Sequence, residues 1–235
     1  MVVDMLHYLE THAEKILATK PVKTPILLFG KRSYISYMPR GVVLVIAPWN
    51  YPFQLIMVPV VSALAAGNSV IVKPSEVTPL VGQWVEQLFR RAGAPEHLVQ
   101  VAHGDGKVGS ALIEAGPDFI FFTGSVRTGK IVQQEAAKRL IPTILELGGK
   151  DPMIVFADAH LERAAKGALW GALTNCGQVC MSVERIYVER PVYEQFVQLL
   201  SRELERIKRK PQDDDADLGS MTFPRQREIV REHVT

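Results

Sequence analysis

The chain's only two cysteines, Cys176 and Cys180, lie four residues apart in the stretch TNCGQVCMS. A thiolate is a nucleophile and a metal ligand, so three interpretations arise: a disulfide or metal pair, two inert buried thiols, or a catalytic thiol beside a bystander. Two cysteines make no disulfide framework, and zinc patterns need more Cys or His ligands than this stretch supplies. The disulfide and metal interpretations are therefore the least favoured.

Three polar residues follow apolar runs that read as strands. Lys73 and Glu76 lie in KPSE, and Asn50 lies in APWNYPF, whose prolines stiffen the loop. Each alone is typical of a surface charge or a turn residue. Together, an ammonium and a carboxylate can hydrogen-bond the two hydroxyls of a ribose, and an amide can donate to an oxyanion.

Glu146 lies in LELGGK, at the end of an apolar run. Its carboxylate must be paired, solvated or raised in pKa there, and a raised pKa suits a general base. A carboxylate satisfied by backbone groups or by an arginine has comparable weight.

The segment GDGKVG (104–109) imitates the G-x-G-x-x-G dinucleotide fingerprint. That fingerprint requires an acidic residue at the end of the next strand, which instead ends in Thr123, Gly124 and Ser125. A glycine-rich turn is the better interpretation, although Gly106 could still line a nucleotide pocket.

The segment GSVRTGK (124–130) imitates a phosphate-binding P-loop, but Ile131 stands where Ser or Thr must bind magnesium. What remains is a glycine-containing turn that leads into a helix. The N-terminus of that helix favours a phosphate or pyrophosphate.

The elements that must position these residues follow a repeating pattern. Short apolar runs rich in β-branched residues alternate with helical periodicity, and their continuous apolarity predicts strands buried on both faces. The predicted strands are 41–48, 68–74, 98–104, 118–124 and 142–149. The pattern predicts an α/β fold with a doubly wound parallel sheet, followed by part of a second α/β domain. We expect an N-terminal helix and connecting strand over 1–40, a dinucleotide-binding domain over 41–146 and a partial catalytic domain over 147–235.

Bulk properties exclude several classes of protein. The 235 residues are 47% hydrophobic and 22% charged, with a net charge of +2, which leaves no general electrostatic footprint for nucleic acid. No apolar run approaches membrane-spanning length, and the N-terminus lacks a signal peptide's apolar region. We expect a cytoplasmic protein. The acidic run 213–217 reads as a solvated loop.

Taken together, five stretches resemble the aldehyde dehydrogenase superfamily. They are PWNYPF, KPSE, FTGS with Gly129 four positions after Ser125, LELGGK, and GQVCMSVER. Each is weak alone, but all five occur in the family's order and at the family's spacings. PRGVVLVIAPWNYPF and TILELGGK are similar to the branch that oxidises fatty and aromatic aldehydes.

The resemblance implies a catalytic set. The family's nucleophile lies two residues after its Gly-Gln pair, which makes Cys180 the nucleophile and Cys176 the bystander. The implied reaction oxidises a small-molecule aldehyde to a carboxylic acid through a cysteine thiohemiacetal and a thioester. Asn50 and the Cys180 backbone N–H would hold the oxyanion, and Glu146 would be the general base.

The resemblance also implies a nicotinamide cofactor, NAD with NADP possible. Lys73 and Glu76 would hold the adenosine ribose, and Ser125 with the helix it opens would hold the pyrophosphate. The remaining residues expected to line the groove are Trp49, Gly106, Thr123, Gly124, Gly129 and Leu147.

The chain also departs from the family. It lacks the later Glu-x-Phe-Gly-Pro stretch and the C-terminal segments that complete the catalytic domain, so we expect a fragment of a longer enzyme with exposed apolar surface. The complete enzyme would be a homo-oligomer. Two alternatives stay open: a non-catalytic NAD-binding or assembly module of the same family and, less favoured, a phosphate-binding nucleotide hydrolase.

Overall fold

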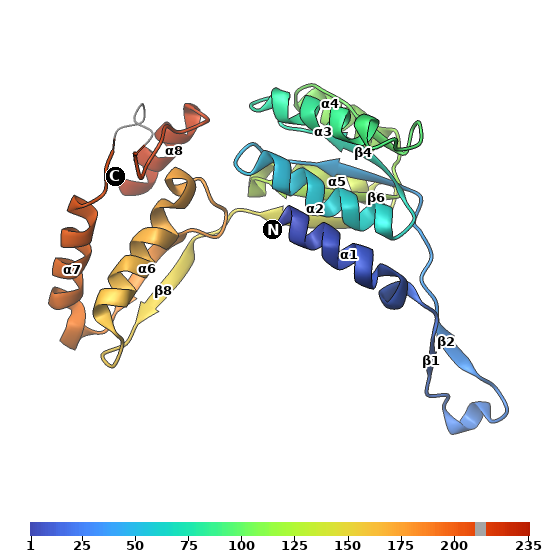
Figure 1. Ribbon diagram of the computed structural model, residues 1–235, viewed down its shortest axis with the longest axis horizontal. Coiled ribbons are helices and arrows are strands. Elements are labelled where there is room, and N and C mark those ends of the chain that lie inside the picture. Colours follow the sequence, from blue (N-terminus) through green and yellow to red (C-terminus); the bar gives the residue numbers. More distant parts are fainter. Residues whose placement is uncertain (210–214) are drawn as a thin grey trace. The chain divides into compact units, whose positions relative to one another are not determined.

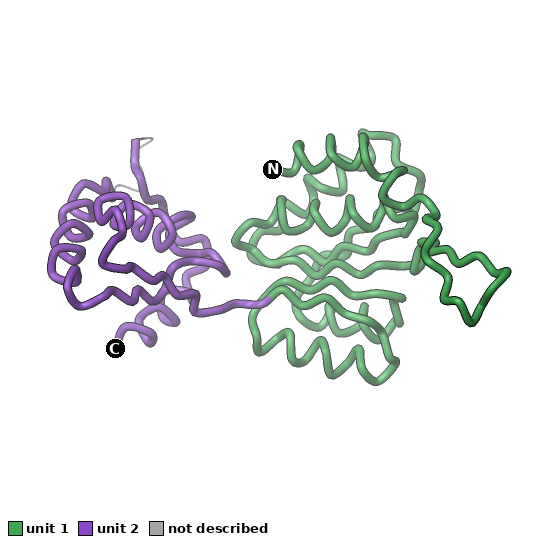
Figure 2. Tube along the Cα trace, turned by 90° about the horizontal axis from the view of Figure 1, so that it is seen from below, with its two compact units in different colours: residues 1–146 green, residues 147–235 purple. Residues whose placement is uncertain are grey.

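The structure is a computed structural model that describes residues 1–209 and 215–235. It divides into two compact units, Met1–Glu146 (unit 1) and Leu147–Thr235 (unit 2) (Figures 1 and 2). The acidic run predicted as a loop lies partly outside the described residues; of its acids, Asp215 and Asp217 are described, and both contact Lys208. Within the described ranges, no helix combines the length and apolarity needed to cross a membrane.

A five-stranded parallel sheet is the centre of unit 1, as the sequence predicts. Its strands are β3 (Val42–Ile46), β4 (Ser69–Lys73), β5 (Val99–Val101), β6 (Phe119–Gly124) and β7 (Thr143–Leu147). The spatial order is β5-β4-β3-β6-β7. Strand order reverses between β3 and β6, so this is the topological switch point at which doubly wound sheets bind ligands.

Four crossover helices cover the sheet in two layers (Figure 2). They are α2 (Pro52–Ala65), α3 (Pro79–Arg91), α4 (Gly106–Glu114) and α5 (Val126–Ala137). Helices α2 and α3 pack against each other, as do α4 and α5. Right-handed connections place the two pairs on opposite faces, which confirms the doubly wound arrangement.

The central strands form the core because they are β-branched and sandwiched between helices. Val45, Val70 and Val72 are at most 1% exposed, and α2 adds Ile56 and Val60, both fully buried. The two edge strands differ from the sequence prediction of burial on both faces. In β7, every second residue is exposed, and β5 has no fully buried residue, because an edge strand has a sheet neighbour on one side only.

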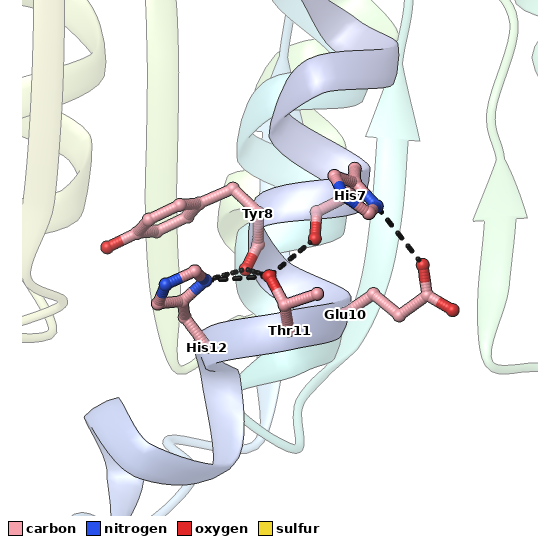
Figure 3. A network of polar contacts seen from close by, with 5 residues as sticks. All are labelled: His7, Tyr8, Glu10, Thr11 and His12. Atoms are coloured by element: carbon pink, nitrogen blue, oxygen red, sulfur yellow. Dashed lines mark hydrogen bonds and ion pairs between the residues drawn. The ribbon is translucent and has the colours of Figure 1, made fainter.

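Helix α1 (Val2–Leu17) packs its apolar side on this core through Val2, Met5 and Leu9. Its exposed side carries a local polar network (Figure 3), and all of its contacts lie within one or two turns. The Thr11 hydroxyl donates to the His7 carbonyl at 2.9 Å, and the rings of Tyr8 and His12 stack 4.4 Å apart. These contacts are local helix stabilisation at the surface.

A short antiparallel hairpin follows α1. It pairs β1 (Lys20–Val22) with β2 (Ser33–Ile35), and the 3-10 turn η1 (Ile26–Leu28) lies at its tip. Each of these two strands is three residues long. The tip exposes Ile26, Leu27 and Phe29 almost completely.

Unit 2 has a parallel pair of strands, β8 (Asp151–Val155) and β9 (Val183–Val188). The remaining elements are α6 (Leu161–Leu173), the 3-10 turns η2 (Thr174–Gly177) and η3 (Arg190–Val192), α7 (Tyr193–Glu205) and α8 (Arg225–Val234). Its core is separate from that of unit 1: Val155, Ala165, Ala168 and Phe196 are each at most 1% exposed.

Candidate functional site

In unit 1, the predicted cofactor residues lie at the carboxyl edge of the sheet. The register aligns Ile46 of β3 with Lys73 of β4 on one side and with Phe122 of β6 on the other. The Ala47 N–H still donates to the Lys73 carbonyl at 3.1 Å. The loop that carries Trp49 and Asn50 therefore leaves the sheet between the ends of β4 and β6, at the switch point.

Lys73 and Glu76 form an ion pair at the end of β4. The Lys73 Nζ donates to Glu76 Oε2 at 2.8 Å; the Lys73 side chain is 6% exposed and the Glu76 side chain is 55% exposed. Burial raises the pKa of Glu76, but the hydrogen bond from Lys73, a backbone hydrogen bond and the charge of Lys73 together outweigh it, so the pKa lies below its ordinary value. The ion pair thus places a buried ammonium beside a carboxylate that faces solvent.

The loop that carries this pair is packed closely by α3. A Cβ on Gly82 of that helix would lie 2.5 Å from Pro74 Cγ and 2.9 Å from His103 Cε1. Only glycine permits the helix to approach the loop this closely. The close packing fixes the backbone that follows Lys73.

The end of β6 combines a buried hydroxyl with a helix N-terminus. Thr123 is 7% exposed, and its Oγ1 has no hydrogen-bond partner among the described residues. Ser125 is the N-cap of α5, and its Oγ accepts from the Thr128 N–H at 3.2 Å. Gly124 has no room for a side chain, because a Cβ would lie 2.5 Å from Phe122 Cζ. Gly129 is buried one turn into α5.

The GDGKVG stretch forms a turn that opens α4. Asp105 caps this helix by accepting from the Lys107 N–H at 2.9 Å, and Gly104 has a φ of +148° with Val108 against it. Gly106 is exposed, and a Cβ there would meet no atom within 4 Å. The surface at Gly106 is open to a ligand, although nothing in this turn itself selects a nucleotide.

Trp49, Asn50, Glu146 and Leu147 are the other predicted residues near this edge. Trp49 and Asn50 are partly buried and already have interaction partners. Glu146 and Leu147 are the last two residues of β7; Glu146 is exposed and Leu147 is partly buried. Of the options that the sequence left for the Glu146 carboxylate, the structure shows the solvated one.

In unit 2, the two cysteines occupy different environments. Cys180 is exposed, whereas Cys176 is partly buried, and its Sγ donates to the Gly219 carbonyl at 3.3 Å. Cys176 lies in η2, where Asn175 has a φ of 52°, Cys176 of 58° and Gly177 of 74°. Three consecutive residues in the left-handed region are uncommon for L-residues, and this turn leads directly to Cys180.

Gln178 links this turn to a distant segment. It is 5% exposed; its Nε2 donates to the Asn175 carbonyl at 2.9 Å, and its Oε1 accepts from the Thr222 N–H at 2.8 Å. A buried amide with both ends hydrogen-bonded is costly to disrupt. Gln178 lies within the stretch TNCGQVCMS, two residues before Cys180, and nothing in the sequence indicated its burial or its bond to Thr222.

The residues after β7 lie beside Cys180 within unit 2. A Cβ on Gly149 would lie 2.6 Å from Asp151 Oδ1 and 3.8 Å from the Cys180 carbonyl oxygen. The neighbouring Lys150 pairs with Glu184, and the Arg185 guanidinium donates to the Lys150 carbonyl at 2.6 and 3.0 Å. Gly149 of LELGGK therefore lies close to the backbone of Cys180, a contact that sequence reasoning did not anticipate.

The comparisons with known proteins agree with one another. The family model described as the aldehyde dehydrogenase family matches residues 1–235. A 4,4'-diapolycopene aldehyde oxidase from Methylomonas sp is 48% identical over 99% of this chain and 44% of its own length. A 4,4'-diaponeurosporen-aldehyde dehydrogenase from Staphylococcus aureus is 42% identical over 79% of this chain and 40% of its own. The chain spans under half the length of these curated relatives.

Solved structures show the same likeness. The putative aldehyde dehydrogenase PutA from Anabaena variabilis superposes with a TM-score of 0.92 at 36% identity, covering 99% of this chain and 49% of that one. A substrate-bound aldehyde dehydrogenase from Staphylococcus aureus gives a TM-score of 0.90 at 34% identity, covering 99% and 51%.

Proposed function

Because the chain belongs to the aldehyde dehydrogenase family, we propose that it carries the cofactor groove and the nucleophile of an enzyme that oxidises an aldehyde to a carboxylic acid with NAD or NADP. The observation that carries the proposal is the exposed Cys180 thiol, which follows a left-handed turn that Gln178 ties to Thr222. An exposed thiol held in this way is suited to attack a carbonyl.

The covalent step takes place at Cys180. Its thiolate adds to the aldehyde carbonyl carbon, forming a C–S bond and placing a negative charge on the oxygen. The carbon then gives up its hydrogen as a hydride, which the nicotinamide accepts when bound, and a thioester remains on Cys180. Water cleaves the C–S bond, which releases the acid and returns the thiol.

Two donors are assigned to the developing oxyanion: the side-chain amide of Asn50 and the backbone N–H of Cys180. Donors that face a developing charge act most strongly in a site from which water is excluded. Removing one such donor costs about 3 kcal/mol of barrier in well-studied cases. The assignment rests on the resemblance of PWNYPF to the family's motif.

Glu146 is assigned as the general base that deprotonates the hydrolytic water and assists ionisation of Cys180. Support comes from its place in the sequence, three residues before Gly149, which lies against the Cys180 carbonyl. Its exposed carboxylate is free to accept a proton from water.

Residues at the sheet edge fit a dinucleotide. Lys73 and Glu76 supply a donor and an acceptor suited to the hydroxyls of the adenosine ribose, and the N-terminus of α5 after Ser125 suits a pyrophosphate. The buried Thr123 hydroxyl has no hydrogen-bond partner in the described part of the chain, so it has bonding capacity for a ligand. Trp49, Gly106, Gly124, Gly129 and Leu147 complete the proposed groove.

We propose NAD as the preferred cofactor. The Glu76 carboxylate is ionised at neutral pH, and its pKa lies below the ordinary value, so it repels a 2'-phosphate. Lys73 acts in the opposite sense, and a relative from Mycolicibacterium smegmatis that is 40% identical bears the name succinate-semialdehyde dehydrogenase [NADP(+)]. For the substrate we propose an apolar aldehyde, in line with the polyene aldehydes named for two relatives.

The test is a stopped-flow record of NADH absorbance when the native chain, saturated with NAD or with NADP, meets a long-chain aldehyde. We expect a burst or steady rise that Cys180→Ala abolishes, because the covalent intermediate cannot form. In the comparison variant Cys176→Ala we expect the signal to be reduced but not abolished, because Cys180 still forms the intermediate while the contact of Cys176 with Gly219 is lost. Aldehyde oxidation that survives in Cys180→Ala would remove the nucleophile assignment.

A second candidate function is binding of NAD without turnover. It is favoured by the division of the chain, because the residues proposed for the cofactor at β4 and β6 belong to unit 1, a compact unit that does not contain Cys180. Saturable NAD binding by calorimetry, with equal absence of NADH formation in the native chain and Cys180→Ala, would establish it.

A further inference from the structure

Gln178 is the best-connected buried polar side chain near the nucleophile. Its backbone N–H and its Nε2 both donate to the Asn175 carbonyl, at 3.1 and 2.9 Å, and the Asn175 Nδ2 donates back to the Gln178 carbonyl at 3.3 Å. These three bonds close the turn on itself. Because Asn175 and Cys176 are non-glycine residues in the left-handed region, the turn needs such bonds to persist.

The same side chain ties the turn to a segment far along the chain. Gln178 Oε1 accepts from the Thr222 N–H at 2.8 Å, and three residues earlier the Gly219 carbonyl accepts from Cys176 Sγ. Residues 219–222 thus hold the turn at two points. We call the set of Asn175, Cys176, Gln178 and residues 219–222 the turn clamp.

We infer that Gln178 is a positioning residue for Cys180: through the turn clamp it maintains the left-handed turn that presents the thiol to the carbonyl substrate. The inference rests on the proposed function, because it assigns a role to the residue two positions before the proposed nucleophile. We assign Gln178 no contact with the substrate or the cofactor. It acts only by fixing the backbone that leads to Cys180.

Two substitutions separate the parts of the clamp. Gln178→Met keeps the volume and neutrality of the side chain but leaves the Asn175 carbonyl and the Thr222 N–H without their side-chain partner. Gln178→Glu keeps an acceptor for Thr222 and loses the donor to Asn175. Gln195→Met is the matched control, since Gln195 is exposed on α7 in the same unit.

Hydrogen exchange tests the clamp without any turnover. In Gln178→Met we expect the amides of residues 175–182 and 219–222 to exchange roughly tenfold faster, because local opening no longer breaks these hydrogen bonds. Gln178→Glu should lie between it and the native chain, and Gln195→Met should match the native chain. Unchanged exchange in Gln178→Met overturns the inference.

Alkylation of Cys180 by iodoacetamide tests the consequence for the thiol. At alkaline pH, where thiols are ionised and the rate reaches its plateau, we expect Gln178→Met to lower the rate about threefold. A released turn no longer holds the thiol in one orientation, which lowers the plateau rate, and the substitution introduces no charge. An unchanged plateau shows that the clamp does not position Cys180 and overturns the inference.

Where the native chain forms NADH, Gln178→Met should lower kcat and leave the KM for NAD unchanged. Equal kcat values overturn the inference. The proposed function fails separately, by survival of aldehyde oxidation in Cys180→Ala, and that result would leave the exchange data on the clamp intact.

Discussion

At the end of β4, a buried ammonium and a mostly exposed carboxylate share one hydrogen bond. Lys73 is enclosed by the sheet and its neighbouring loop, so its charge is poorly hydrated, and Glu76 supplies the compensating charge. The ion pair therefore stabilises the fold even when no ligand is bound. A ribose that bound here would exchange part of this ion pair for hydrogen bonds to its hydroxyls.

The lowered pKa of Glu76 makes a prediction about acid stability. Because the folded-state pKa lies below the ordinary value of 4.5, the pair stabilises the fold at pH values above 4.5 and loses this contribution as the pH falls through the lowered value. Urea unfolding of the native chain and Glu76→Gln should therefore differ at neutral pH and converge in acid. A difference that persists undiminished below the folded-state pKa would show that the charge of Glu76 is not what stabilises the fold.

At the scale of the element, α3 packs against the loop that follows Lys73 of β4 and carries Glu76. The helix lies so close to the KPSE loop that Gly82 almost touches Pro74, and this contact joins the backbone after Lys73 to the helix layer. By contrast, Gly109 of α4 is also a buried helical glycine, but a Cβ there would meet no atom within 4 Å. A side chain at Gly82 would clash with Pro74, whereas Gly109 has room for one.

This contrast gives a paired prediction. Gly82→Ala should destabilise the fold by about 1–3 kcal/mol, because the added methyl overpacks the contact with Pro74. Gly109→Ala should stabilise it by roughly 0.4–1 kcal/mol, since alanine loses less chain entropy in a helix and has room. Chemical denaturation of both variants is the measurement; equal effects would contradict the role of close packing at Gly82.

At the scale of the whole molecule, the chain exposes more apolar surface than a self-contained monomer needs. Leu27 is 93% exposed and Phe29 is 94% exposed at the hairpin tip, and Phe156 and Trp170 of unit 2 are more than half exposed. Such surfaces mark protein contacts. We propose that they are covered by other segments of a longer enzyme or by a second copy in a homo-oligomer.

The self-association of the isolated chain follows from this exposure. In sedimentation velocity we expect a concentration-dependent rise in mass for the native chain, and a smaller rise when Leu27→Asp and Phe29→Asp are combined, because the charges oppose burial of the tip. Leu140→Asp is the control, as Leu140 is 90% exposed elsewhere in unit 1. Equal association by both variants would exclude the tip as a contact.

The sequence by itself determined the sheet and the order of its motifs. Continuous β-branched runs can bury themselves only between two helix layers, and this local requirement placed β3, β4 and β6 within one or two residues of their observed bounds. The bounds of β7 agree equally well, whereas β5 ends three residues early. The predicted burial on both faces was wrong for β5 and β7, because the exposure of an edge strand depends on which strands are its neighbours. Residue types at the strand ends likewise singled out Lys73 and Glu76, whereas Cys180 was singled out as the expected nucleophile by the resemblance of GQVCMSVER to the family.

Only the tertiary structure decided which side chains are buried and which residues they contact or hydrogen-bond. Nothing local predicts that Gln178 would be buried, that its partner would be Thr222 44 residues away, or that Gly149 would lie against the Cys180 carbonyl. Likewise, Thr123 reads as an ordinary strand residue until its hydroxyl proves to be buried without a partner in the described ranges. Hydrogen bonds between distant segments depend on how the chain folds back, and no periodicity or motif encodes that return.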